Sequence, residues 1–417
     1  MQSQAAEVIT RCRQLAEITD VAGTTTRLFL SSAAKTAHVL LGQWMQAAGL
    51  EVRIDDAGNL RGIRHSALLS APTFLLFSHI DTVPDAGAFD GVLGVVLGLA
   101  VIESFRDRPL PFSIELIAFS EEEGIRFSLP FIGSRAVIGE LASDDLDRED
   151  SNRISLASAI REFDLDPTQI PVTCPLRHNT FAALEVHIEQ GPILEDEDRS
   201  IAVVTSVAGQ TRLGLTFEGR AGHAGATPME LRRDALTAAA WWLTEVETYA
   251  AERDPLVATV GRIEVLPGAV NVIPGIAHVV LDVRHPDDGH RHFAVAALLE
   301  KAEAVAALRG IRVQIALQSD RPAVDLDERL SMALLKASAE SGHSTRSVFS
   351  GAGHDAMILA PHVPTTMLFV RSPEGLSHHP HETVRECDVE AALATVKSFV
   401  EHLSRCDVST FKKSLTI

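Results

Sequence analysis

The chain has 417 residues, of which 56 are acidic and 37 basic, and its formal net charge is −19. Its length exceeds one ordinary core and predicts two domains, and a hydrophobic content of 46% excludes a disordered chain. So negative a surface repels nucleic acid and anionic membranes, and no stretch of 18 apolar residues is present to span a bilayer. We therefore expect neither a nucleic-acid partner nor a membrane partner.

The four cysteines are Cys12, Cys174, Cys387 and Cys406. They form no C-x-x-C pair, which argues against a zinc knuckle and against a dithiol redox motif. Free thiols in a reducing compartment are the simplest interpretation. The N-terminal segment has the pattern of an amphipathic helix and lacks the apolar run of a signal peptide. These features predict a cytoplasmic protein.

The first 208 residues have the pattern of an α/β domain. Apolar runs at 73–78 and 113–119 are typical of buried strands, and small apolar residues between them predict a helix. A polar stretch later in this part predicts an irregular segment that contains helix. The expected elements are two helices and a strand pair within 1–65, strands at 73–78, 113–119, 184–189 and 201–207, a helix at 91–106 and the irregular segment at 141–180.

A second pattern begins at Gly209, where the expected elements follow the order β-α-β-β-α-β of a ferredoxin-like unit. Thr227, Pro228 and Glu230 are residue types that cap the start of a helix, so a helix is expected to begin there. The expected elements are strands at 211–217, 256–265, 277–284 and 311–318 and helices at 227–252 and 289–308.

After this unit the chain returns to the first pattern, with a helix expected at 327–341, a strand at 365–370 and a helix at 388–404. Internal repeats and low-complexity segments are absent from the sequence. The sequence therefore predicts a larger α/β domain built from residues 1–208 and 326–417, interrupted by an inserted domain of residues 209–325.

Three side chains suited to a metal site follow the first buried strand. His79 and Asp81 are two residues apart, so in an extended chain they share a face, and the carboxylate can orient an imidazole that binds metal. Asp90 precedes the small-residue helix, where its carboxylate can bridge two cations. Each position also has an ordinary interpretation, because His79 can be a structural histidine and Asp90 a helix cap.

Acids and histidines recur at three later points. Glu121, Glu122 and Glu123 follow a predicted strand directly, and three adjacent acids there are costly without positive partners. A metal ion would offset the repulsion, with one glutamate as a ligand and a neighbour as general base. His187 ends another strand, and His378 opens a run with three histidines in four residues. A solvated loop and surface histidines are the alternatives.

Together these positions supply three imidazoles, one bridging carboxylate and one terminal carboxylate, a set that suits a pair of divalent ions. Most of them follow predicted strands, and open α/β sheets place their sites at the carboxyl ends of strands. Five such signals in this order are far more specific than any one of them.

Several longer stretches resemble a known family. They are SHIDTVPDAGAFDGVLGV, EEEGIRF, HIEQG, GRAGHAGATPMELRRDA, PGAVNVIPG, LDVRH, GAGHDA and GLSHHPHE. They resemble the amidase/carbamoylase branch of the metal-dependent aminoacylase and carboxypeptidase superfamily, and the resemblance covers nearly the whole chain. The branch includes allantoate amidohydrolases, N-carbamoyl-L-amino acid hydrolases and β-ureidopropionases. The resemblance implies an α/β fold, with a di-metal aminopeptidase-like catalytic domain and an inserted ferredoxin-like (βαββαβ) dimerisation domain.

Carried over residue by residue, the resemblance implies two divalent metal ions per subunit, with Asp90 as the bridging ligand. Glu122 matches the general base, and Asp81 matches the carboxylate that orients His79. Glu121 has no assigned role. Mn²⁺ and Zn²⁺ suit such a donor set, and Co²⁺ and Ni²⁺ are further candidates. The implied metal ligands are His79, Asp90, Glu123, His187 and His378.

The inserted domain is expected to supply the substrate side. Arg212, Asn271 and Arg284 resemble substrate-binding residues, since a guanidinium group suits a carboxylate and an amide can recognise a ureido group. Arg284 alone could equally be a surface residue at a strand end. His223 resembles a residue that acts in trans, in the active site of the partner subunit of a homodimer, and stabilises the tetrahedral intermediate. Further residues expected to line the pocket are Gln210, His354 and Asp355.

The resemblance favours a small ureido carboxylate as substrate. Arg371 follows the last predicted strand, and an additional arginine near the site would favour allantoate, with hydrolysis to ammonia and carbon dioxide. N-carbamoyl-L-amino acid hydrolase or β-ureidopropionase is the alternative, and a plain aminoacylase or dipeptidase fits the motifs less well. A non-catalytic metal-binding protein on the same fold would need a broken ligand or base, and every expected position is filled.

Overall fold

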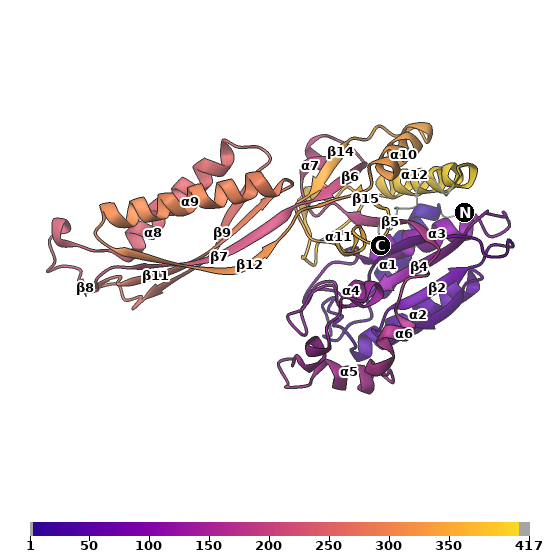
Figure 1. Cartoon of the computed structure of the whole chain (residues 1–417), viewed down its shortest axis with the longest axis horizontal. Helices are drawn as coiled ribbons and strands as arrows, with labels where there is room; N and C mark the ends of the chain where they lie inside the picture. Colours follow the sequence, from indigo (N-terminus) through magenta and orange to yellow (C-terminus); the bar gives the residue numbers. More distant parts are fainter. Residues whose placement is uncertain (1–2, 408–417) are drawn as a thin grey trace. The chain divides into compact units, whose positions relative to one another are not determined.

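A computed structural model describes residues 3–407 of the chain (Figure 1). The described chain forms two compact units. The first unit holds the described residues up to Thr205 together with those from Asp325 onward, and the second holds Ser206–Val324. Among residues 3–407, no helix combines the length and the apolar character needed to cross a membrane.

The first unit is built on a mixed sheet of nine strands in the described chain. Their order is β1-β2-β4-β3-β5-β15-β6-β13, with β14 paired to β6. β3, β4, β5 and β15 are parallel to their neighbours among these four strands, so their carboxyl ends meet at one edge. The strands are β1 (Glu51–Ile54), β2 (Leu60–Arg64), β3 (Thr73–His79), β4 (Ser113–Phe119), β5 (Thr180–Ile188), β6 (Ile201–Val207), β13 (Val324–Asp325), β14 (Ser347–Ser350) and β15 (Thr365–Val370).

Helices pack against this sheet around one large apolar core. Helix α3 is apolar on all sides, and its residues 92–102 are all buried, as expected for a helix enclosed by other elements. The helices are α1 (Gln4–Ala16), α2 (Ser32–Ala47), α3 (Val92–Ser104), α4 (Ile132–Ile138), α5 (Leu156–Glu162), α6 (Ile170–Thr173), α7 (Ile193–Asp196), α10 (Glu328–Glu340), α11 (Asp355–Leu359) and α12 (Glu386–Arg405).

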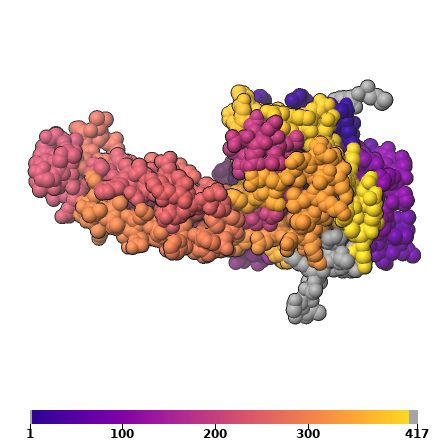
Figure 2. All heavy atoms as spheres, turned by 90° about the horizontal axis from the view of Figure 1, so that it is seen from above, coloured from indigo at the N-terminus to yellow at the C-terminus, as the bar shows by residue number. Residues whose placement is uncertain are grey.

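The second unit is a four-stranded antiparallel sheet in the order β12-β7-β11-β9, with two helices on one face. In Figure 2 its atoms, coloured pink to orange, form one continuous body. Alternate residues such as Leu213, Leu215 and Phe217 are buried under the helices, so the residues between them point to the open face. The elements are β7 (Gly209–Glu218), β8 (Gly222–His223), α8 (Ala235–Ala251), β9 (Val257–Leu266), β10 (Val272–Ile273), β11 (Ile276–His285), α9 (Asp288–Leu308) and β12 (Arg312–Arg321).

These elements confirm the predicted fold class, and the β-α-β-β-α-β order of the second unit is present in β7, α8, β9, β11, α9 and β12. The predicted strands at 201–207 and 365–370 match β6 and β15 at both ends. The four cysteines are unpaired, as expected.

The predicted start of the helix after Thr227 is wrong. α8 begins at Ala235, where the side chain of Asp234 accepts a hydrogen bond from the backbone of Thr237. Residues 224–233 instead form a loop that contains one short 3-10 helix at Met229–Leu231, and the Arg232 guanidinium group closes this loop by donating hydrogen bonds to the Ala224 carbonyl (2.6 Å) and the Thr227 carbonyl (3.1 Å). Tertiary contacts thus override a local capping pattern.

Candidate active site

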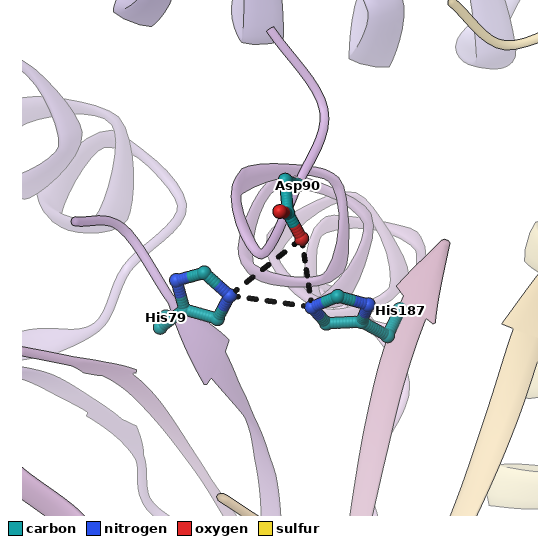
Figure 3. A group of neighbouring side chains, drawn as sticks. All are labelled: His79, Asp90 and His187. Carbon is teal, nitrogen blue, oxygen red and sulfur yellow. Dashed lines mark hydrogen bonds and ion pairs between the residues drawn. The ribbon is translucent and has the colours of Figure 1, made fainter. Parts of the chain in front are cut away.

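Three side chains from distant stretches meet at the carboxyl edge of the large sheet (Figure 3). His79 is the last residue of β3, His187 lies near the end of β5, and Asp90 precedes Gly91, the N-cap residue of α3. The Nε2 atoms of the two histidines are 3.2 Å apart. Asp90 Oδ1 lies 3.2 Å from Nε2 of His187 and 3.9 Å from Nε2 of His79.

Two glycines allow Asp90 to approach these histidines. A Cβ atom on Gly91, whose φ is +65°, would lie 2.5 Å from the ring of His79. A Cβ atom on Gly94 would lie 1.9 Å from the carbonyl oxygen of Val186 on β5. Only glycine therefore fits where α3 begins and crosses the sheet. The small residues that predicted this helix also determine how closely Asp90 approaches its neighbours.

The other oxygen of Asp90 faces a second group. Nε2 of His378 lies 3.0 Å from Asp90 Oδ2 and 3.3 Å from Glu123 Oε1. The potential ligand atoms of Asp90, Glu123 and His378 all lie within 4.8 Å of one another, and so do those of His79, Asp90 and His187. The structure thus brings together all five predicted ligands, with the Asp90 carboxylate between the two groups.

The tautomers in this arrangement fit metal binding. Nδ1 of His79 lies 3.1 Å from the Asp81 carbonyl oxygen, and Nδ1 of His187 lies 2.9 Å from the Ile188 carbonyl oxygen. A carbonyl oxygen only accepts, so both Nδ1 atoms donate, and in neutral rings both Nε2 atoms present lone pairs. Two lone pairs 3.2 Å apart repel each other unless a positive charge lies between them.

The charges around the site also favour the binding of cations. Burial disfavours the charged form of His79, but Asp81, Glu122 and Asp90 outweigh it and hold the pKa of that imidazole well above its usual value. Hydrogen bonds to Asp90 and Glu123 raise the pKa of His378 to about 10. A positive charge is therefore favoured in each group, and a divalent cation can supply it. The donor set therefore fits divalent cations.

Asp81 connects this site to the loop that carries Glu121, Glu122 and Glu123. Its carboxylate accepts hydrogen bonds from the backbone N–H groups of Glu122 and Glu123, both at 3.1 Å, and lies 3.6 Å from Nδ1 of His79. The Asp81 carboxylate therefore positions the loop that follows β4, while the Asp81 backbone carbonyl oxygen accepts the hydrogen bond from the imidazole. The orienting role of the carboxylate stays a prediction.

The three adjacent glutamates have separate surroundings. A potential ligand atom of Glu122 lies within 4.8 Å of those of His79 and Glu123, and the Glu122 side chain is buried. Glu121 has a φ of +54°, and its Oε1 accepts hydrogen bonds from the backbone of Arg126 (2.8 Å) and Phe127 (3.2 Å). Glu121, which the sequence left without a role, therefore shapes the loop.

Two residues that the sequence analysis did not assign hold Asp90 in place. The Gln190 side-chain amide donates hydrogen bonds to both Asp90 oxygens, at 3.2 Å each. The Glu382 carboxylate accepts from the backbone N–H groups of Phe89 (2.8 Å) and Asp90 (3.0 Å). Both lie within the HIEQG and GLSHHPHE stretches, so their motifs were visible although their contacts were not.

The His354 side chain is buried behind His187. It is 1% exposed, and its ring centroid lies 4.5 Å from that of His187. Its Nε2 is hydrogen-bonded to the Ser350 hydroxyl at 2.9 Å. The structure therefore places His354 behind a candidate metal ligand, and its contribution to a substrate pocket stays a prediction. The neighbouring Asp355 is fully buried as well.

The candidate substrate residues of the second unit form two groups. Gln210, Arg212 and Arg284 all contact the carboxylate of Asp282 on the open face of the sheet. His223 and Asn271 lie together on the small β8–β10 sheet, where His223 is in register with the residue that follows Asn271. His223 is exposed.

The role expected for Arg371 is corrected by its contacts. The Arg371 side chain is buried and donates two hydrogen bonds to Asp388, at 2.9 and 2.7 Å, and one to Asp198 at 2.9 Å. Its guanidinium group therefore joins β15 to α12. The argument for allantoate that rested on this arginine does not hold.

Arg371→Met is expected to destabilise the fold by about 3–5 kcal/mol, because it leaves the carboxylate of Asp388 buried without a partner. Chemical unfolding measures this loss. The double variant Arg371→Met/Asp388→Leu should recover most of it, since no buried charge is then left unpaired. A changed substrate preference in the folded single variant would contradict the structural role.

Comparison with known proteins bears on this site. The profile of peptidase family M20/M25/M40 matches residues 75–402. The chain belongs to this family. The M20 chain is 35% identical to allantoate deiminase 2 of Glycine max, over 95% of this chain and 89% of the relative. It is 37% identical to an N-carbamoyl-L-amino acid amidohydrolase of Geobacillus stearothermophilus, over 88% of this chain and 91% of the relative.

A solved structure agrees with these relatives. The hydantoinase/carbamoylase family amidase of Burkholderia multivorans superposes with a TM-score of 0.90 at 33% identity, covering 95% of this chain and 97% of its own. The M20 chain is therefore an amidohydrolase of the hydantoinase/carbamoylase branch. The family is metal-dependent, and the buried histidine and aspartate cluster is the candidate metal site.

Proposed function

We propose that this amidohydrolase binds two divalent metal ions and cleaves a ureido C–N bond in a small carboxylate substrate. The observation that carries the proposal is the position of Asp90, whose two oxygens face separate groups of ligands. His79, His187 and Asp90 would hold one ion. Asp90, Glu123 and His378 would hold the other. Mn²⁺ or Zn²⁺ suits these ligands, with Co²⁺ and Ni²⁺ as alternatives.

The residues of the chain take distinct roles in the proposed reaction. Bound divalent ions lower the pKa of a water molecule and polarise a carbonyl group. Glu122 accepts a proton from the attacking water and delivers it to the leaving nitrogen. Asp81 holds the ring of His79 and the loop that carries Glu122. The carbamate formed on cleavage breaks down to ammonia and carbon dioxide.

The second unit is proposed to bind the rest of the substrate. Arg212 and Arg284 suit a carboxylate, and the side-chain amide of Asn271 suits a ureido group. His223 donates a hydrogen bond to the carbonyl oxygen as negative charge develops there. We propose that it does so in trans, in a homodimer. The exposure of His223 supports a role outside its own unit.

Allantoate is the first proposed substrate and an N-carbamoyl-L-amino acid the second. The similarity to an allantoate deiminase over 95% of this chain supports the first, and the similarity to an N-carbamoyl-L-amino acid amidohydrolase at 37% identity supports the second. Both compounds combine a ureido group with one carboxylate, so the same binding residues serve either.

Ammonia release from a panel of ureido compounds tests this proposal. The protein is treated with a chelator, resupplied with Mn²⁺, and assayed with allantoate, N-carbamoyl-L-amino acids and N-acetyl-L-amino acids by a coupled ammonia or amine assay. We expect metal-dependent turnover of allantoate or an N-carbamoyl compound and a much slower reaction with the acetyl compounds. Absence of turnover with every ureido compound would contradict the proposal, and faster cleavage of the acetyl compounds would indicate an aminoacylase.

A further inference from the structure

The open face of the second unit's sheet carries a cluster centred on an acid that the sequence analysis gave no role. Asp282 lies on β11 directly opposite Arg212 on β7, and Arg284 lies opposite Gln210. The two strands run side by side in the middle of the sheet (Figure 1). The four side chains therefore share the face opposite α8 and α9, because their positions alternate with the buried residues of both strands.

Asp282 accepts four hydrogen bonds from this cluster. Its Oδ2 accepts from Gln210 Nε2 and Arg212 Nε, both at 2.8 Å, and from an Nη atom of Arg284 at 3.3 Å. Its Oδ1 accepts from Nε of Arg284 at 2.8 Å. Both oxygens of Asp282 are therefore engaged within the cluster, Oδ2 by three donors and Oδ1 by one. Three of the predicted substrate-binding residues are thus fixed by one carboxylate.

The Arg212 side chain is more exposed than that of Asp282, so a ligand can reach it. The Asp282 side chain is 21% exposed, whereas that of Arg212 is 48% exposed. Arg212 contacts Asp282 through Nε at 2.8 Å, and about half of its side chain stays accessible to a ligand. Burial disfavours the charged form of Asp282, but hydrogen bonds from Arg284 and Arg212 hold its pKa below the usual value, so it is charged at neutral pH.

We propose that Asp282 is a positioning residue that sets the spacing of Arg212 and Arg284 and cancels one of their two charges, so that the pair selects a substrate with one carboxylate over one with two. The inference rests on the proposed function, in which these arginines bind the substrate carboxylate. Two guanidinium groups without a neighbouring acid would favour a dicarboxylate. Asp282 lowers the net positive charge of the pair, and the preference for a substrate with one carboxylate follows from that lower charge.

Equilibrium binding tests the proposal without turnover. The parent is the Glu122→Gln variant loaded with Mn²⁺, and calorimetry measures its affinity for N-carbamoylglycine, with one carboxylate, and N-carbamoyl-L-aspartate, with two. Asp282→Asn in this parent is expected to weaken binding of N-carbamoylglycine about tenfold. The ratio of the affinities for N-carbamoylglycine and N-carbamoyl-L-aspartate should fall about tenfold as well. Asp282→Glu keeps the charge but moves the carboxylate. Binding of N-carbamoylglycine should therefore weaken about threefold, and the preference for it over N-carbamoyl-L-aspartate should remain.

A matched control is available on the same face of the sheet, at the end of the neighbouring strand β7. The Glu218 carboxylate accepts from Arg312 (2.9 Å) and Gln314 (2.7 Å), which also makes it an acid between an arginine and an amide. Glu218→Gln in the same parent should leave both affinities within twofold. If Asp282→Asn fails to fold, Asp282→Glu carries the test, because unchanged binding of N-carbamoylglycine would contradict the positioning role.

The outcomes separate this inference from the proposed function. Unchanged affinities in Asp282→Asn, or no binding of either compound by the parent, would overturn the role of Asp282. Failure of the unmodified protein to hydrolyse any ureido compound would overturn the proposed function alone, provided that the parent still binds the monocarboxylate and that Asp282→Asn binds it about tenfold more weakly.

Discussion

Glu122→Gln is expected to lower kcat by about a thousandfold while the protein keeps its full metal content. Glutamine has nearly the same shape as glutamate but cannot accept a proton from water and pass it on. The change leaves the ligand groups intact, since His79, Asp90, Glu123, His187 and His378 are untouched. The loop also keeps its anchor, because Asp81 binds the backbone of residue 122 and not its side chain. Steady-state rates and elemental analysis of the same preparation measure both quantities.

Glu121→Gln provides the control for this variant. It makes the same chemical change one residue earlier in an equally buried position. The carbonyl oxygen of a glutamine can still accept the hydrogen bonds from Arg126 and Phe127, so we expect the rate to stay within a few fold of the unmodified protein. A Glu122→Gln variant that retains a tenth of the normal rate would remove Glu122 from the role of general base.

Asp90→Asn is expected to remove at least one metal ion per subunit and nearly all activity. Only one oxygen remains in the asparagine side chain, so it cannot serve the group with His187 and the group with His378 at once. The loss of activity should exceed the roughly 10–100-fold loss that is typical when a residue behind a metal ligand is removed. Metal content after dialysis, measured beside kcat, tests this expectation.

Gln190→Ala gives the comparison that this prediction needs. Gln190 donates to both oxygens of Asp90, so its removal loosens the bridging carboxylate without removing a ligand. We expect metal affinity to fall by about 10–100-fold, with activity restored at high metal concentration. Two tightly bound ions in Asp90→Asn, or an effect no larger than that of Gln190→Ala, would contradict the bridging role of Asp90.

The sequence predicted a candidate metal cluster because its residues follow strand ends, and the structure brings these side chains together. His79, Glu123 and His187 end or follow apolar runs that are long enough to be identified as buried strands, and parallel strands bring such ends together. Asp90 was found through the small-residue helix that follows it. The structure shows that this residue does not cap the helix through its side chain, because the N-cap position is Gly91.

Features that depend on tertiary contacts were not predictable in the same way. Arg371 follows a strand in the same manner as the metal residues do, but its partners Asp388 and Asp198 lie in other elements, and these contacts make it structural. The charge of Asp282 is visible in the LDVRH stretch, yet its role depends on the register that sets it opposite Arg212. The alternating pattern of β7 and β11 predicts that both residues share one face, but which residue lies opposite which also depends on the turns that connect the strands in the folded sheet.

The glycines of α3 limit how this protein can be made more heat-resistant. Replacing a helical glycine by alanine is a common route to higher stability, worth about 0.5–1 kcal/mol where space allows. At Gly94 the added methyl group would meet a backbone carbonyl at 1.9 Å, so thermostabilising substitution there would displace the helix and with it Asp90. At Gly98 the nearest atom is the end of the Leu116 side chain at 3.0 Å, which can move. In a selection for thermal stability, substitutions at Gly98 should therefore be tolerated, and substitutions at Gly94 should not.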